Sequence, residues 1–216
     1  MKKQTTYAVF GLGRYGTAVA KELVENGKEV LAVDLDQKLV NDAAAYLPIC
    51  KCADITDAEV IARLGIGSID TVIVCMASNL EASVMAVTLC KEAGVKTVIA
   101  KCGSEMHRKI LLRVGADQVV FPENESGIRL AKNLLSSGFV DVISLSKDVS
   151  IVEIDVKEEW MGKNLIELNL RKKYGINIVA IQRGDAVNTS INPEEPLEGD
   201  ATLIVIAEAS KLEKLR

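Results

Sequence analysis

The chain has 216 residues, of which 49% are hydrophobic and 26% are charged, with a formal net charge of -4. This balance is typical of a globular protein with one large domain, or with one domain and a smaller second one. The negative charge argues against nucleic-acid binding, which usually needs a basic face. No apolar run reaches the ~18 residues that span a bilayer, and the first residues lack the apolar stretch of a signal peptide. We therefore expect a cytoplasmic location.

The five cysteines do not form two CxxC pairs, and the sequence has one histidine. Tetrahedral zinc needs four ligands at suitable spacing, so a structural zinc site is not expected. In a cytoplasmic protein these cysteines are predicted to be reduced and mostly buried thiols.

Short apolar runs alternate with helical patterns over the first 121 residues. Strands without polar alternation, separated by helices, predict a parallel sheet covered on both faces. The predicted fold class is therefore α/β, a Rossmann-type doubly wound sheet. The expected strands are 7–10, 29–33, 49–53, 71–75, 97–100 and 118–121. The first expected helix follows Gly16, and four more are expected over 39–46, 58–64, 80–93 and 106–114.

The sequence divides into three parts. Residues 1–122 form the parallel-sheet domain, residues 123–147 a crossover helix and linker, and residues 148–216 a smaller α+β lobe. The crossover segment places Ile128, Ala131, Leu134 and Leu135 on one face, which can pack on its own sheet or on a second copy of the chain. In the last part we expect strands over 151–156, 177–182 and 203–207, a helix over 165–174, and a tight turn at 184–185.

A glycine-rich loop follows the first predicted strand and opens the first helix. Gly11-Leu12-Gly13-Arg14-Tyr15-Gly16 has the pattern GxGxxG, which is informative in this context and weak without it. The first glycine permits the turn, the second lets the backbone approach a diphosphate, and the third lets helix and strand pack closely. Free N–H groups at the start of the helix then face the anion.

An acid closes the second predicted strand. Asp34 lies 21 positions after Gly13, where a carboxylate can accept hydrogen bonds from both ribose hydroxyls and would repel the 2′-phosphate of NADP. Asp36 can assist or can equally start the next helix. Arg14 stands in the first helical turn, where the helix dipole disfavours a cation unless a phosphate is bound. The alternative for Arg14 is a solvated surface charge.

Other candidate residues fall at the same edge of the sheet, because ligands of open α/β sheets bind at the carboxyl ends of strands. They are Asp54 after the third strand, Met76, Ala77 and Ser78 after the fourth, Lys101 after the fifth and Glu123 after the sixth. Lys101 can also be a solvated strand end, and Glu123 a helix-start acid behind Pro122. His107 can serve as an acid–base in a dehydrogenase or as a ligand contact.

These residues resemble a known family. Residues 8–16 and 30–34, the run Val114-Gly115-Ala116-Asp117 leading to Phe121-Pro122-Glu123, and the run 170–175 leading to Val179-Ala180-Ile181 are similar to the RCK (or KTN) domain. That domain regulates potassium channels and transporters. The similarity covers nearly the whole chain, and its single N-lobe and C-lobe are most similar to the cytosolic subunit of Ktr-type potassium uptake systems.

The resemblance implies a nucleotide site in the N-lobe for ATP or ADP, or for NAD or NADH in some members. Arg14 would meet the terminal phosphates, Asp34 would hold the ribose, and Glu123 would help to place Mg²⁺ or Ca²⁺, or Arg14, near the phosphates of a neighbouring subunit. The residues implied to surround the nucleotide are Gly11, Leu12, Gly13, Tyr15, Gly16, Leu35, Asp36, Asp54, Ile55, Met76, Ala77, Ser78, Lys101, Cys102, Gly103 and His107.

The resemblance also implies a ligand and partners beyond the N-lobe. In some members the C-lobe binds cyclic di-AMP between two copies, and the matching positions here are Leu165, Ile166, Arg171, Asn177 and Ile178. The implied function is a non-enzymatic regulator that assembles from dimers into an octameric ring beneath a membrane potassium-translocating subunit. Two alternatives stay open at this point, an NAD-dependent oxidoreductase and a regulator of a potassium channel or antiporter.

Overall fold

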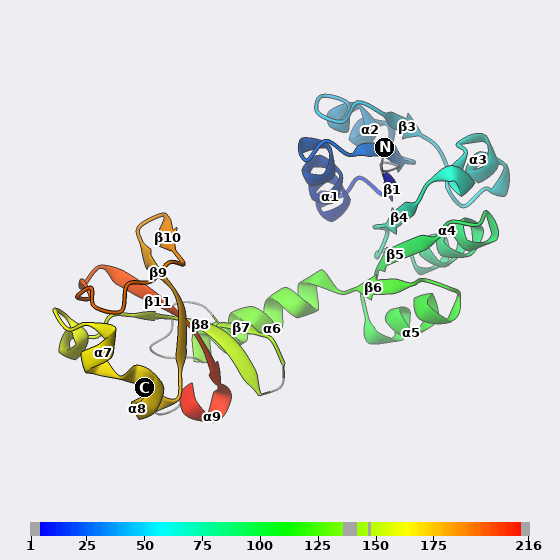
Figure 1. Ribbon diagram of the computed structural model, residues 1–216. Coiled ribbons are helices and arrows are strands. Elements are labelled where there is room, and N and C mark those ends of the chain that lie inside the picture. The colour runs from blue at the N-terminus through cyan, green and yellow to red at the C-terminus, as the bar shows by residue number, and fades with distance from the viewer. Residues whose placement is uncertain (1–4, 136–141, 147, 213–216) are drawn as a thin grey trace. The chain divides into compact units, whose positions relative to one another are not determined.

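The structure is a computed structural model that describes residues 5–135, 142–146 and 148–212. It contains two compact units, residues 1–123 and residues 124–216 (Figure 1). The division falls just inside the helix that follows the sixth strand. The expected crossover part therefore contributes its first residue to one unit and the rest to the other.

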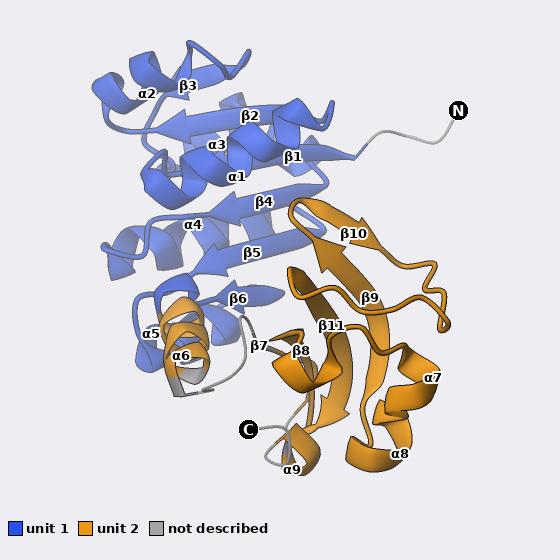
Figure 2. Ribbon diagram, turned by 90° about the vertical axis from the view of Figure 1, so that its left-hand side faces the viewer, with its two compact units in different colours: residues 1–123 blue, residues 124–216 orange. Residues whose placement is uncertain are grey.

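The first unit is built on one six-stranded sheet. Every neighbouring pair of strands is parallel, in the order β3-β2-β1-β4-β5-β6, and Figure 2 shows the strands stacked in this order. This confirms the predicted Rossmann-type fold, and the strand order reverses between β1 and β4, where such folds bind ligands. The strands are β1 (Thr6–Phe10), β2 (Glu29–Asp34), β3 (Cys50–Cys52), β4 (Thr71–Val74), β5 (Thr97–Lys101) and β6 (Gln118–Val120).

Helices cover both faces of this sheet because its strands are apolar on both sides. Along β1, Ala8 and Phe10 belong to one buried core and Val9 to the other, as the period of two along a strand requires. The connecting elements are α1 (Arg14–Glu25), α2 (Gln37–Ala43), α3 (Ala58–Arg63), the short 3₁₀ helix η1 (Ile66–Ser68), α4 (Leu80–Glu92) and α5 (Glu105–Arg113). Residues of α1 and α2 pack in the core of Val9, and residues of α3, α4 and α5 pack in the other.

The second unit contains an antiparallel five-stranded sheet in the order β10-β9-β11-β8-β7. Its apolar core gathers around Trp160, Ile176 and Leu203, which confirms a smaller α+β lobe. Strand β7 lies in the stretch expected as a linker and pairs with β8. The elements are α6 (Pro122–Leu135), β7 (Val142–Ser144), β8 (Val149–Asp155), η2 (Glu158–Trp160), α7 (Leu165–Leu168), α8 (Leu170–Tyr174), β9 (Asn177–Arg183), β10 (Ala186–Asn188), β11 (Ala201–Glu208) and α9 (Ala209–Leu212).

The single helix predicted over 165–174 is wrong, because the structure divides it into α7 and α8. Asn169 lies between them with a left-handed φ of 47°. Asparagine adopts this conformation more readily than most residues, and there it ends one helix and starts the next. Asn164 and Glu167 form a capping box at the start of α7, which favours a separate short helix.

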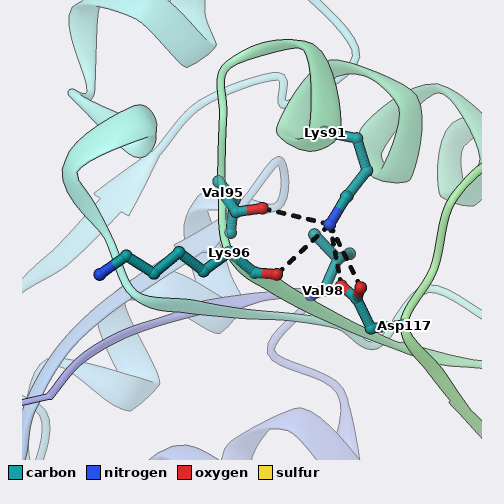
Figure 3. A network of polar contacts seen from close by, with 5 residues as sticks. All are labelled: Lys91, Val95, Lys96, Val98 and Asp117. Carbon is teal, nitrogen blue, oxygen red and sulfur yellow. Dashed lines mark hydrogen bonds and ion pairs between the residues drawn. The ribbon is translucent and has the colours of Figure 1, made fainter.

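A polar network lies at the amino ends of β5 and β6 (Figure 3). The ammonium group of Lys91 contacts the carbonyl oxygens of Val95 and Lys96 and lies 3.0 Å from Asp117 Oδ2. The same carboxylate accepts a 2.7 Å hydrogen bond from the Val98 amide. Burial acts to raise the pKa of Asp117, but the Val98 amide and Lys91 outweigh it, and the pKa is lowered.

We expect Asp117→Asn to destabilise the protein by about 1 kcal/mol at pH 7, because Lys91 loses an anionic partner. A carboxyl with a lowered folded pKa stabilises the fold above its ordinary value of 3.8, and this contribution disappears as the pH falls through the folded pKa. Urea unfolding of both proteins at pH 7 and at pH 3 should therefore show a gap that narrows in acid. Asp42→Asn, an exposed acid on α2, is the control, and a gap that persists at pH 3 would contradict the assignment.

Candidate functional site

The glycine-rich loop joins β1 to α1 at the carboxyl edge of the parallel sheet. Gly11 has a φ of 92°, a backbone conformation that favours glycine. A Cβ on Gly16 would lie 1.9 Å from the carbonyl oxygen of Gly11, so the third glycine lets α1 press against the loop. A Cβ on Gly13 would meet nothing within 4 Å, and this exposed position leaves the backbone open to a ligand.

The amino end of α1 lacks the side-chain capping seen elsewhere in the unit. Gly13 is its N-cap and has no side chain, and the first turn contains no acid. By contrast, side chains of Asp36, Asp57, Asn79 and Ser104 accept hydrogen bonds from the first turns of α2, α3, α4 and α5. The first amides of α1 are therefore suited to an anion, which the helix dipole also favours.

Asp34 ends β2 beside this loop. Its Oδ2 accepts a 2.6 Å hydrogen bond from the Leu12 amide, and its Oδ1 accepts one of 2.8 Å from the Asp36 amide. The carboxylate therefore holds the loop in place, and each oxygen keeps a further lone pair for a hydroxyl donor. Asp36 itself caps α2 by accepting from Lys38 N at 2.8 Å, as the alternative for this residue expected.

Lys101 connects three elements at the same edge. Its ammonium lies 2.5 Å from Glu123 Oε1 in the first turn of α6 and 5.6 Å from the centre of the Tyr15 ring in the first turn of α1. The hydrogen bond with Lys101 lowers the pKa of Glu123, and the charge of Arg14 acts in the same direction. Arg14 itself is exposed.

His107 is 5% exposed, and both of its ring nitrogens have partners within the domain. Nδ1 accepts from the Gly103 amide at 3.4 Å, so the assigned tautomer carries its proton on Nε2, which lies 2.8 Å from Ser83 Oγ. The Ser83 hydroxyl donates in turn to the Leu80 carbonyl. Burial lowers the pKa of His107, and the contacts of both ring nitrogens within the domain do not favour the expected ligand contact or acid–base chemistry.

The structure places the other expected residues in different surroundings. Asp54 Oδ1 accepts from the hydroxyl and the amide of Thr56, which lowers the pKa of Asp54. A Cβ on Gly103 would lie 3.2 Å from the Ala77 carbonyl oxygen, so the loops after β4 and β5 lie side by side. The side chains of Ile55 and Cys102 are buried, whereas Leu35 is 68% exposed and Ser78 is exposed.

The five cysteines are free thiols, but the prediction that most are buried is wrong. Cys90 and Cys102 are buried, Cys50 and Cys75 are partly buried, and Cys52 is exposed. Burial raises the pKa of Cys75 and of Cys90 to about 12, so neither is a thiolate at neutral pH.

The second unit contains a cavity of about 250 Å³ beside α7, α8 and β9. Four of the five residues singled out in the sequence line it, namely Leu165, Arg171, Asn177 and Ile178. Ile166 is not among the lining residues and is 60% exposed. Asn169, Leu170 and Ile176 also line the cavity and were missed by the sequence analysis.

Two features are absent from the residues that the structure describes. None of the described helices has the length and apolar character needed to cross a membrane. Over the same residues, no group of three or more histidine, cysteine, aspartate or glutamate side chains is arranged to hold a metal ion. Glu123 therefore has no partner acids for a protein-only metal site within the described part of the chain.

The parallel sheet, the open glycine loop and the acid at the end of β2 together have the arrangement of a Rossmann-type domain. The TrkA-N domain family matches residues 7–122, and the TrkA-C domain family matches residues 149–216. The chain belongs to the family of Ktr system potassium uptake proteins, with one TrkA-N domain and one TrkA-C domain.

Relatives match over almost the whole chain. The Ktr system potassium uptake protein C of Bacillus subtilis is 39% identical over 99% of this chain and 96% of its own length. The Ktr system potassium uptake protein A of Vibrio alginolyticus is 34% identical over 95% of this chain and 94% of its own length.

Solved structures share the fold. The GsuK channel bound to NAD aligns over 98% of this chain with a TM-score of 0.66 and 18% identity, and the chain spans 38% of that channel subunit. The TrkA-N domain of the inner membrane protein ybaL from Escherichia coli aligns over 62% of this chain and 99% of its own, with a TM-score of 0.55 and 14% identity.

Proposed function

We propose that the chain is the nucleotide-sensing subunit that gates a membrane potassium transporter. ATP or ADP, or alternatively NAD or NADH, binds at the glycine loop, with its ribose at Asp34 and its phosphates at the start of α1. The observation that carries this proposal is the uncapped amino end of α1 behind the open Gly13, with Asp34 held against Leu12 at 2.6 Å. The names of the Ktr relatives support potassium uptake as the process.

A regulatory role fits the site better than a dehydrogenase. His107 is the only histidine, and both of its nitrogens are occupied within the protein. Histidine is the side chain that most often serves as the acid–base of a hydride-transfer enzyme, and no other histidine is available. Regulation of a channel or antiporter by the same binding event stays as the alternative, because the membrane partner is not part of this chain.

The divalent cation is proposed as a companion of the phosphates. Glu123 supplies one carboxylate, and the phosphate oxygens would supply further oxygen ligands, the type that Mg²⁺ and Ca²⁺ prefer. This division of ligands agrees with the lack of an acid cluster among the residues the structure describes.

Arg14→Ala is expected to lower the affinity for ATP by about ten-fold and the affinity for ADP by less than about two-fold. The reason is that the exposed guanidinium at the start of α1 would meet the terminal phosphate that ADP lacks. Calorimetric titration of both nucleotides into the full chain measures this difference. Lys21→Ala removes the same charge from an exposed position of α1 and should change neither affinity. Equal losses of ATP and ADP in Arg14→Ala would end the proposal that Arg14 distinguishes them.

The cavity of the second unit is proposed as the site for cyclic di-AMP. Arg171 offers a cation for a phosphate, Asn177 an amide for a base edge, and Leu165 and Ile178 offer apolar contact. The volume of about 250 Å³ is below that of a typical drug-sized site, which fits a ligand shared between two copies. Titration with cyclic di-AMP tests this site independently of the nucleotide.

Assembly into dimers and an octameric ring is proposed from exposed apolar side chains on two helices. On α6, Ile128 is 50% and Leu134 is 77% exposed, and on α5, Met106 is 66% exposed. Ala131 is exposed as well, and the side chain of Leu135 lies outside the described residues. Surfaces of this kind are usually covered by a partner.

Light scattering of the full chain with ADP should therefore give a mass several times 23.3 kDa at micromolar concentration. Leu134→Glu should lower that mass, because it places a charge in the covered face. A 23.3 kDa species in the wild type would contradict assembly.

A further inference from the structure

The ammonium group of Lys101 is held between an acid and an aromatic ring. Glu123 Oε1 lies at 2.5 Å and the Tyr15 ring centre at 5.6 Å. The Lys101 side chain is 14% exposed, whereas that of Glu123 is 64% exposed. A lysine with so little access to water needs an anion beside it, but the carboxylate can turn into solvent at little cost.

The same ammonium lies where phosphates would arrive. Tyr15 belongs to the first turn of α1, immediately after the open Gly13 and Arg14. Two cations act on Glu123, Lys101 from the end of β5 and Arg14 from the start of α1. A polyphosphate at the glycine loop would be drawn to both of these cations and repelled by the carboxylate between them.

We propose that Lys101 exchanges its anionic partner when a nucleotide binds: Glu123 holds it in the ligand-free chain, and the phosphates take it over, which releases Glu123 at the start of α6. The inference rests on the proposed nucleotide site and adds how that site is regulated. Lysine suits an exchange because its compact ammonium pairs with a carboxylate or a phosphate without fixed geometry. The lysine stays and the more exposed carboxylate leaves.

The exchange gives Glu123 two successive roles. In the ligand-free chain it pairs with Lys101, so an arriving phosphate must displace it. Once released, it is free to meet a divalent cation on those phosphates. The first turn of α6 then carries an uncompensated carboxylate, and the residues of this helix after Glu123 belong to the second compact unit.

The test is a double-mutant cycle with ADP as the probe and EDTA present, measured by calorimetry on the full chain. Glu123→Gln should tighten ADP binding by about two- to five-fold, the range of a partly exposed ion pair. In the Lys101→Gln background the same change should alter affinity by less than about 1.5-fold, because the partner is gone. Glu92→Gln removes an exposed acid at the end of α4 and should leave ADP affinity unchanged.

Three results would overturn the proposal. Equal tightening in both backgrounds would mean simple repulsion of phosphate by Glu123. Weaker ADP binding in Glu123→Gln would mean that Glu123 stabilises the bound state without a cation. If the wild type did not bind ADP, the proposed nucleotide site would fail and the exchange with it, whereas the first two results leave that site standing.

A second measurement needs no change at Lys101. The ¹³C signal of the Glu123 carboxyl, assigned with Glu123→Gln, reports its titration in the otherwise unaltered chain. Addition of ADP without divalent cations should raise the pKa of Glu123, because its carboxylate loses the bond to Lys101 and negative phosphates arrive nearby. An unchanged titration in ADP-saturated protein would show that the ion pair persists and would overturn the exchange.

Lys101→Arg is a further control for the double-mutant cycle, because it keeps the cation. In the Lys101→Arg background, Glu123→Gln should again tighten ADP binding, as it does in the wild type.

Discussion

Asp34→Ala should lower the affinities for ATP, ADP and NAD together, by roughly ten- to a hundred-fold. The group common to these ligands is the adenosine ribose, and a hydrogen bond to a charged acceptor is worth ~1.5–3 kcal/mol. The structure adds a second cause, because the carboxylate also accepts from the amides of Leu12 and Asp36 and so holds the loop in its binding shape. Calorimetry with the three ligands measures the loss. Asp42→Ala, on the exposed side of α2, is the control.

Asp34→Asn separates these two causes. Asparagine keeps one acceptor oxygen for the loop but loses the charge that would repel a 2′-phosphate. The preference for NAD over NADP should therefore shrink in Asp34→Asn, whereas a purely structural role would reduce both affinities by the same factor. Unchanged binding of all three nucleotides in Asp34→Ala would remove Asp34 from the site.

The parallel sheet was predictable because its signals are local. Most strands contain a short apolar run, such as Val72 to Val74, and the helices after α1 each begin at a capping residue, such as Asn79 before α4. The second unit was less predictable. Its antiparallel order depends on pairings between distant segments, for example β8 with β11, and no local pattern specifies which strands meet. The division at Asn169 was missed because a left-handed asparagine leaves the apolar spacing on both sides intact.

The candidate site was predictable as positions along an edge, but not as contacts. The sequence placed Lys101 and Glu123 after neighbouring strands, and their direct ion pair depends on how α6 starts behind Pro122. His107 could not be assigned from its spacing, since its partners Ser83 and Gly103 come from another helix and from a loop. The roles of these residues toward a nucleotide stay predictions.

Gly16→Ala is expected to destabilise the protein by about 2–3 kcal/mol, although alanine is the better helix former by ~1 kcal/mol. The new Cβ would stand 1.9 Å from the Gly11 carbonyl oxygen and 3.2 Å from Cys75 Cβ. The first of these atoms belongs to the backbone, so α1 must move away from the loop. Overpacking of this kind typically costs 1–3 kcal/mol. Urea unfolding of the wild type and the variant measures the change.

Two other glycines make the test specific to packing. Gly127→Ala lies inside α6 with nothing within 4 Å of the new Cβ, so helix propensity alone should apply and the protein should gain a few tenths to ~1 kcal/mol. Gly13→Ala also meets no atom within 4 Å and should leave stability nearly unchanged, but its methyl group enters the space that the phosphates would approach, so ADP affinity should fall. A stabilised Gly16→Ala would show that α1 is not pressed against Gly11. A Gly13→Ala variant that binds ADP as tightly as the wild type would place the phosphates away from this loop, whatever the stability of the fold.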